Sequence, residues 1–119
     1  MIGSKKEIVN ANSGIAHNSI ASGTVIKGDI QSDSDFRLDG QVEGSIVCNG
    51  KIIIGQVGSI KGNTQCVSAE VCGKVEGDIR ASERLVLKST ATVTGNIYCP
   101  SLEIEPKALF NGACQMANE

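Results

Sequence analysis

The sequence predicts an all-β fold, a parallel β-helix (β-solenoid) of about six coils with roughly 17 residues in each coil. The first observation is a short motif, an apolar residue on either side of a polar–glycine–polar centre, that recurs six times. Its glycines, spaced 15 to 18 residues apart, are Gly28, Gly44, Gly62, Gly77, Gly95 and Gly112. The second is that aromatic residues make up only 3% of the chain, as suits a narrow interior. One coil cannot bury its own apolar face, so the coils must stack.

Alternate positions around each glycine are apolar or small, as expected for the inward face of a strand. Two residues before the glycine stand Ile26, Val42, Ile60, Val75, Val93 and Phe110. Two residues after it stand Ile30, Ile46, Thr64, Ile79, Ile97 and Cys114. Four residues after it stand Ser32, Cys48, Cys66, Ala81, Cys99 and Met116. We refer to each of these sets as a slot of the coil.

The residues next to each glycine are mostly polar and are expected to face solvent. Directly before the glycine, the charge alternates along the first four repeats, through Lys27, Glu43, Lys61 and Glu76. Equivalent residues on stacked parallel strands lie about 4.8 Å apart, where opposite charges attract. The alternation supports one repeat per coil, in register.

A second apolar segment follows several repeats and is expected to form another face of the coil. These segments contain Phe36 and Leu38, residues 52–54, residues 85–87, and Leu102 with Ile104. Turn residues separate the segments, at Asn49-Gly50, Ser82-Glu83 and Pro100-Ser101. Because the repeat length varies, the extra residues are expected in the corners.

Composition narrows the functional class. A chain of 119 residues is expected to form one domain, and its net charge of −2 gives no electrostatic case for binding nucleic acid. It contains no apolar run of about 18 residues and no secretory signal. Five cysteines without such a signal indicate a reducing, cytoplasmic environment with free thiols.

The chain lacks the residue patterns of the enzymes built on β-helices, so we expect no catalytic site and no cofactor. It has no glycine-rich phosphate loop, so no nucleotide is expected. His17, the one histidine, lies outside the repeats, whereas an acyltransferase or a zinc-dependent carbonic anhydrase would need histidines within the coils. Asp33 with Asp35 and Glu103 with Glu105 are expected to be solvated carboxylates, because polysaccharide cleavage needs facing carboxylates and sugar-stacking aromatics.

Three cysteines, Cys48, Cys66 and Cys99, share one slot. A ladder spreads its thiols along the axis, whereas tetrahedral metal binding needs ligands that converge, so no metal site is expected. We interpret the three as small buried apolar residues, although Cys48 and Cys66 on adjacent coils are candidates for a disulfide or a redox role. Cys72 and Cys114 have no partner that the pattern identifies.

The two ends of the solenoid bear most directly on function. End coils expose unpaired backbone groups, which natural solenoids cover with a cap. Residues 8–22 are short, polar and weakly patterned, and the segment after Cys114 is too short for a substantial cap. The last repeat also places Phe110 in a slot elsewhere filled by Ile or Val. We therefore predict end-to-end polymerisation, with Phe110 as the main apolar contact.

The N-terminus carries a candidate membrane-targeting tip. Met1 and Ile2 are apolar, and Lys5 and Lys6 can meet anionic lipid at about 1 kcal/mol each. Such binding is weak for one chain but becomes firm when many copies are linked in a polymer.

The repeats resemble the bactofilins, a family of bacterial polymer-forming cytoskeletal proteins. The resemblance covers roughly residues 20–116 and is most specific at residues 38–46, 73–79 and 93–97. It implies a right-handed, three-faced β-helix that stacks into filaments without nucleotide. The same resemblance implies that bulky apolar residues of the terminal coils, such as Phe110, form the polymer contact.

The resemblance also implies attachment to the cytoplasmic membrane through Met1, Ile2, Lys5 and Lys6, and a scaffold for enzymes that build the cell wall and set cell shape. The expected organisation is a flexible segment at 1–19, a β-helix domain at 20–116 and a short tail at 117–119. Departures from the family pattern are short tails and the presence of Thr64 and Cys114 in an aliphatic slot.

Two other functions remain open on the sequence. One is a β-helix enzyme, either an acyltransferase or a carbohydrate-active enzyme, which would form a discrete monomer or trimer. The other is a monomeric binding module in which residues 8–22 fold over the first coil. Particle size in solution separates both from a filament.

Overall fold

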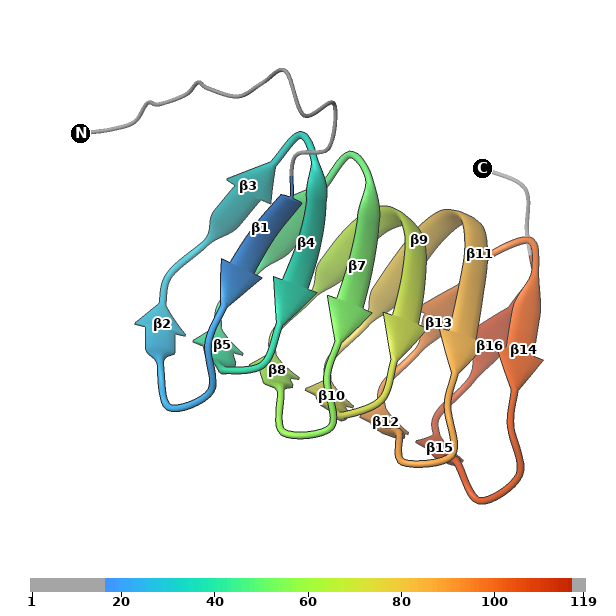
Figure 1. Ribbon diagram of the computed structural model, residues 1–119. Helices are drawn as coiled ribbons and strands as arrows, with labels where there is room; N and C mark the ends of the chain where they lie inside the picture. Colours follow the sequence, from blue (N-terminus) through green and yellow to red (C-terminus); the bar gives the residue numbers. More distant parts are fainter. Residues whose placement is uncertain (1–16, 117–119) are drawn as a thin grey trace.

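The structure, a computed structural model, describes residues 17–116, and within that range all regular structure is β (Figure 1). The strands wind into a solenoid of six coils with three faces. This confirms the predicted all-β solenoid and its period. The described residues contain no helix that could cross a membrane.

Each coil passes in turn through faces A, B and C. Face A consists of β1 (His17–Ile20), β4 (Asp35–Leu38), β7 (Lys51–Ile54), the second halves of β9 (Thr64–Val71) and β11 (Ile79–Leu87), and β14 (Leu102–Ile104). Face B consists of β2 (Val25–Lys27), β5 (Gln41–Glu43), β8 (Ser59–Lys61), β10 (Lys74–Glu76), β12 (Thr92–Thr94) and β15 (Leu109–Asn111). Face C consists of β3 (Ile30–Ser32), β6 (Ile46–Cys48), the first halves of β9 and β11, β13 (Ile97–Tyr98) and β16 (Cys114–Gln115).

Every strand pairing is parallel, and the register aligns the slots identified in the sequence. On face B, Val42 pairs with Ile60, and on face C, Ile46 pairs with Thr64. The stacked inward residues are almost fully buried, from Phe36 to Cys99. The predicted inward slots are therefore confirmed, and the core is a column of aliphatic side chains along the axis.

A glycine turns the chain from face B to face C in every coil. Gly77 has a φ of 140°, in the region that favours glycine, and a Cβ there would lie 2.0 Å from the carbonyl oxygen of Gly62 on the coil below. The coils can stack at this corner only if the position has no side chain. This explains why the glycine is the most regular feature of the repeat.

The residue after four of these glycines, Gly28, Gly62, Gly77 and Gly95, braces the same corner. Its side-chain oxygen accepts a hydrogen bond from the backbone N–H of the equivalent residue on the next coil. The bonds run from Ser45 N to Asp29 Oδ1 (3.0 Å), Asp78 N to Asn63 Oδ1 (3.2 Å), Asn96 N to Asp78 Oδ1 (3.0 Å) and Ala113 N to Asn96 Oδ1 (3.3 Å). The sequence predicted only solvent exposure here, and the structure adds a ladder that satisfies backbone donors.

The corner between faces C and A differs from its prediction. Ser82-Glu83 was expected to be a turn, yet β11 runs without interruption from Ile79 to Leu87. Its pairing with β9 shifts register between Ala81 and Arg84, so the extra residue forms a bulge inside the strand. A bulge bends the strand around the corner while keeping its backbone paired on either side.

The alternating charges of face B lie in register, because Lys27 pairs with Glu43, Glu43 with Lys61, and Lys61 with Glu76. Within residues 17–116, however, no ion pair within 4 Å joins neighbours in this ladder. Glu76 instead pairs with Lys74 on its own strand, 3.0 Å away, and that ammonium lowers the pKa of Glu76. The predicted register is confirmed, but the direct ion pairs between coils lie on face A and at the corner that follows it.

Candidate polymerisation interface

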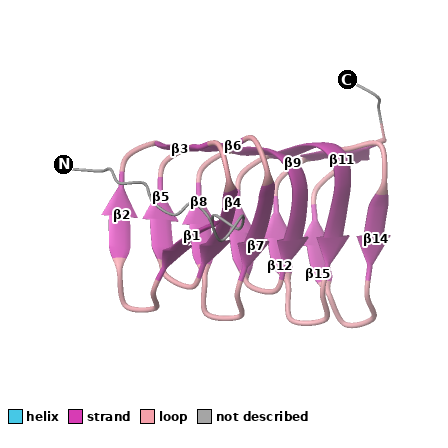
Figure 2. Cartoon of the chain, turned by 45° about the horizontal axis from the view of Figure 1, so that its top comes forward, coloured by secondary structure: helices cyan, strands magenta, loops and turns pink. Residues whose placement is uncertain are grey.

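The strands of the last coil form backbone hydrogen bonds along only one edge. Its strands β14, β15 and β16 pair with β11, β12 and β13 of the coil before, and with no other strand of the described chain. The first coil and the last coil lie at opposite ends of the solenoid (Figure 2). The last coil therefore presents a row of unpaired backbone groups along the axis, which can template another strand.

Apolar side chains gather on this open coil. Phe110 stacks on Val93 and is partly buried against the core. Ile104 is 45% exposed and Met116 is 55% exposed. In the interior coils the equivalent inward positions are almost completely buried by the coil above. The last coil therefore has the side chains of a core without the layer that would cover them.

The inward slots of the sequence did not predict an apolar rim residue, Leu109, on the outside of face B. Leu109 is 63% exposed, and it occupies an outward position directly before the inward slot of Phe110. On interior coils that outward position is polar, with Gln41, Ser59, Lys74 and Thr92. The exception is visible in the sequence when this outward slot is compared across the repeats.

The first coil shows a weaker form of the same pattern. Val25, at the outward position equivalent to Leu109, is 51% exposed. Ile20, Ile26 and Ile30 are only partly buried, although they pack against the core. The two end coils therefore break the polar pattern of face B at the same position.

The other sequence-predicted residues fall in different places. Met1, Ile2, Lys5 and Lys6 lie outside the described residues. Phe110 lies on the last coil, as its slot requires.

The four carboxylates that the sequence predicts to be solvated bind groups on neighbouring coils. Asp33 accepts a hydrogen bond from the side-chain amide of Asn49 at 2.9 Å, and Asp35 accepts one from the N–H of Lys51 at 3.0 Å. Glu103 pairs with Arg84, and Glu105 pairs with Lys88 at 3.3 Å. These carboxylates stabilise the stack of coils, as solvated surface residues can.

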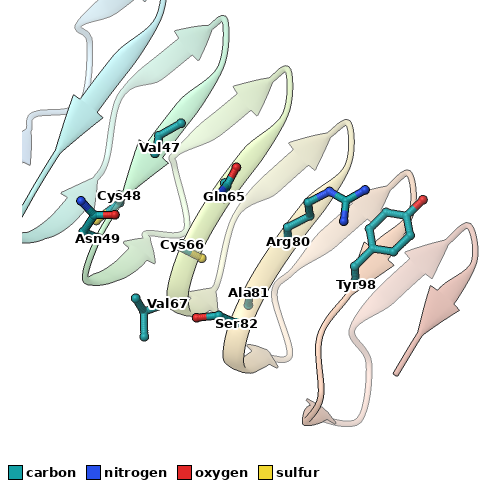
Figure 3. Close-up of a pocket in the computed structure, with 10 residues that line it drawn as sticks. All are labelled: Val47, Cys48, Asn49, Gln65, Cys66, Val67, Arg80, Ala81, Ser82 and Tyr98. Atoms are coloured by element: carbon teal, nitrogen blue, oxygen red, sulfur yellow. The ribbon is translucent and has the colours of Figure 1, made fainter. Parts of the chain in front are cut away.

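A shallow depression of about 320 Å³ lies on face C (Figure 3). Arg80 and Tyr98 form its charged and aromatic side, with the guanidinium 4.2 Å from the ring centroid. The other lining residues are amides, a serine and small apolar groups: Val47, Cys48, Asn49, Gln65, Cys66, Val67, Ala81 and Ser82. A lining with one cation and no carboxylate offers no acid–base pair for hydrolysis.

The slot that holds Cys48, Cys66 and Cys99 forms a buried column of small residues. Burial raises the pKa of the Cys66 thiol to about 12, so the group stays protonated at neutral pH. Burial also raises the pKa of Cys48 and of Cys99. Protonated, enclosed thiols are poor nucleophiles, in line with a packing role for this column.

Comparisons with known proteins agree with this geometry. A family model described as "Bactofilin: Polymer-forming cytoskeletal" matches residues 18–115. The crystal structure of a phenylalanine-to-arginine mutant of the bactofilin from Thermus thermophilus is similar, with a TM-score of 0.72 and 30% sequence identity. The match covers 76% of this chain and 100% of that chain. A comparison with curated proteins finds no match.

Proposed function

Because this chain belongs to the bactofilin family of polymer-forming cytoskeletal proteins, we propose that it is a structural subunit that assembles end to end into filaments. The assembly needs no nucleotide. The filament lies on the cytoplasmic face of the membrane and serves as a scaffold for enzymes of cell-wall synthesis and remodelling. The subunit itself has no catalytic role.

The observation that carries end-to-end assembly is the coincidence of open strand edges and apolar side chains on the last coil. A second copy placed there would extend all three faces by backbone pairing. It would also cover Phe110, Ile104 and Met116, which are left partly exposed. Full burial of a large apolar side chain contributes on the order of 1.5–3 kcal/mol, so several together can drive association.

The rim residue Leu109 supports the same proposal from the outside of face B. An isolated exposed leucine is ordinary, but here it adjoins Phe110 on β15 and so extends one apolar surface. Aliphatic side chains at the margin of a contact exclude water from its centre.

Assembly is tested by negative-stain electron microscopy and sedimentation of the purified full chain without nucleotide. The variants are Leu109→Lys and Phe110→Arg, and the matched control is Gln41→Lys, at the outward position equivalent to Leu109 on an interior coil. We expect filaments in the parent and in the control. We expect Phe110→Arg to abolish filaments and Leu109→Lys to raise the protein concentration needed for them by about tenfold, which corresponds to 1.4 kcal/mol.

Circular dichroism accompanies each variant, because a loss of β structure would make a loss of filaments uninformative. The Leu109→Lys variant is expected to keep its β structure, because a side chain that is 63% exposed can be replaced without disturbing the core. Normal filaments in both variants would refute the last coil as the contact. Small discrete particles in the parent would favour the enzyme or the capped binding module.

A further inference from the structure

Three sulfur-bearing side chains lie near one another at the end of face C, two on the last coil and one on the coil before it. The thiol of Cys114 lies 3.6 Å from the thioether sulfur of Met116. Cys99 lies on the coil below, where its N–H donates to the carbonyl of Gln115 at 3.1 Å, directly between those two residues in sequence. Burial raises the pKa of Cys99, and the neighbouring Cys114 side chain adds to that rise.

Two of these sulfurs occupy positions where the other coils use a different kind of residue. The slot of Cys114 holds four isoleucines and one threonine on the other coils. The slot of Met116 otherwise holds only serine, alanine or cysteine. Cys99 has the size its slot requires, whereas Cys114 is smaller than the isoleucines of its slot and Met116 is larger than the other residues of its own slot. Both exceptions fall on one coil, and both place sulfur beside Cys99.

We propose that Cys99, Cys114 and Met116 form a binding site for one Cu(I) ion. Two sulfurs 3.6 Å apart can both lie about 2.3 Å from a common ion, with a sulfur–metal–sulfur angle of about 100°. Thiolate and thioether are soft ligands and select Cu(I). Binding exchanges two thiol protons for one monovalent cation, and the copper keeps its oxidation state.

The same residues disfavour zinc. A structural zinc site needs four converging ligands, whereas this cluster offers two thiolates and a weakly basic thioether. Within residues 17–116 no group of three His, Cys, Asp or Glu side chains is placed to hold a metal. The three ligands differ in their accessibility to solvent: Met116 is exposed, Cys114 is partly buried and Cys99 is buried. An ion would enter past the thioether and bind to the two thiolates.

The test is an anaerobic titration of the reduced full chain with Cu(I) against a chromogenic Cu(I) chelator. We expect one ion per chain. Cys114→Val, which restores an aliphatic residue to the slot, should weaken binding more than about 100-fold, the upper end of what outer-shell changes cost. Met116→Leu should weaken it about tenfold. The control Cys72→Ser removes a thiol outside the cluster and should change neither affinity nor stoichiometry.

Two further readouts separate this site from non-specific thiol binding. Because binding releases two protons, the apparent affinity for Cu(I) should increase as the pH rises. X-ray absorption of the bound copper should show sulfur ligands only. Nitrogen or oxygen ligands, zinc binding of equal strength, or unchanged affinity in Cys114→Val would each overturn the proposal.

The titration is repeated on Phe110→Arg, because end-to-end assembly would cover the last coil. Binding to that variant alone would support the site and show that assembly blocks it. No binding to either protein would overturn the copper site and leave the assembly proposal intact. Failure of Phe110→Arg to alter filaments would, conversely, leave the copper measurement valid.

Discussion

At the scale of single residues, Cys66 illustrates how the core controls the charge of a side chain. Its ordinary pKa of 9.0 is raised to about 12, mainly by burial in the slot between Cys48 and Ala81. The folded chain therefore retains a proton that the unfolded chain releases above about pH 9. Stability is unaffected below that pH and is lost as the pH rises from 9 towards 12.

We predict that Cys66→Ala makes unfolding less sensitive to alkaline pH. The full loss avoided is on the order of 4 kcal/mol over three pH units, of which part is measurable by pH 10.5. Alanine suits this slot, because Ala81 occupies the equivalent position on the next coil. Urea unfolding between pH 7 and 10.5 measures the effect. If the free energy of unfolding fell equally with pH in the parent and in the variant, the Cys66 thiol would not be the cause of the loss.

Thr64 is the second informative residue of the core. It is buried between Ile46 and Ile79, and its hydroxyl is the one buried side-chain oxygen in residues 17–116 without a hydrogen-bond partner. Burying a hydroxyl without a partner costs about 1–3 kcal/mol. Valine has nearly the same shape and removes that cost.

We therefore predict that Thr64→Val raises the free energy of unfolding by about 1 kcal/mol, measured by urea denaturation. The matched control is Thr94→Val, an exposed threonine on β12, which should change stability by less than about 0.5 kcal/mol. A destabilised Thr64→Val would mean that the hydroxyl has a role in the core.

The sequence could predict the inward residues because a period of two identifies them one strand at a time. It could not predict the bonds of Asp29, Asn63, Asp78 and Asn96 to the next coil, because their partners are backbone groups and leave no pattern of their own.

At the scale of elements, the glycine corner between faces B and C sets how closely coils can stack. Gly28 and Gly77 have nearly equal φ values, 139° and 140°. A Cβ on Gly28 would meet no atom within 4 Å, whereas one on Gly77 would collide with the backbone of Gly62. Substitutions at these two glycines therefore separate the cost of backbone strain from the cost of a steric collision.

We predict that Gly28→Ala costs about 1–2 kcal/mol through strain alone, whereas Gly77→Ala costs several kcal/mol more or prevents folding. Thermal unfolding followed by circular dichroism measures both. Equal losses would mean that strain dominates and that the coils can separate enough to admit a methyl group.

The strands and their register were predictable, but the corner at Ser82-Glu83 was not. Two polar residues between apolar segments usually indicate a turn. Here the backbone of β11 continues through them, and the additional residue is absorbed as a bulge. Local composition cannot distinguish these cases, because the difference depends on pairing with β9.

At the scale of the whole molecule, the open last coil and the N-terminal residues are proposed to act together on a membrane. One weak tip per chain binds little, but a filament presents many tips at once. Met1, Ile2, Lys5 and Lys6 would then supply an attachment that depends on assembly. The sequence alone suggested this segment, and it lies outside the described residues.

We predict that deletion of residues 1–6 preserves filaments and abolishes co-sedimentation with vesicles containing anionic lipid. Phe110→Arg, which keeps the tip and lacks the polymer, should bind the same vesicles at least tenfold more weakly than the parent. Unchanged co-sedimentation of the deletion variant would refute the membrane tip. Equal binding by Phe110→Arg would refute only its dependence on assembly.

The parallel register also has a consequence for the length of the molecule. Each coil begins and ends at the same slots, and differences in coil length are absorbed at the corners without altering the stacked column. Duplication of one interior coil would therefore add a complete layer, with its glycine, its bracing side chain and its inward residues. Such a change would lengthen the subunit by about 4.8 Å at constant cross-section, so that gene duplication could set the axial repeat of a filament in discrete steps.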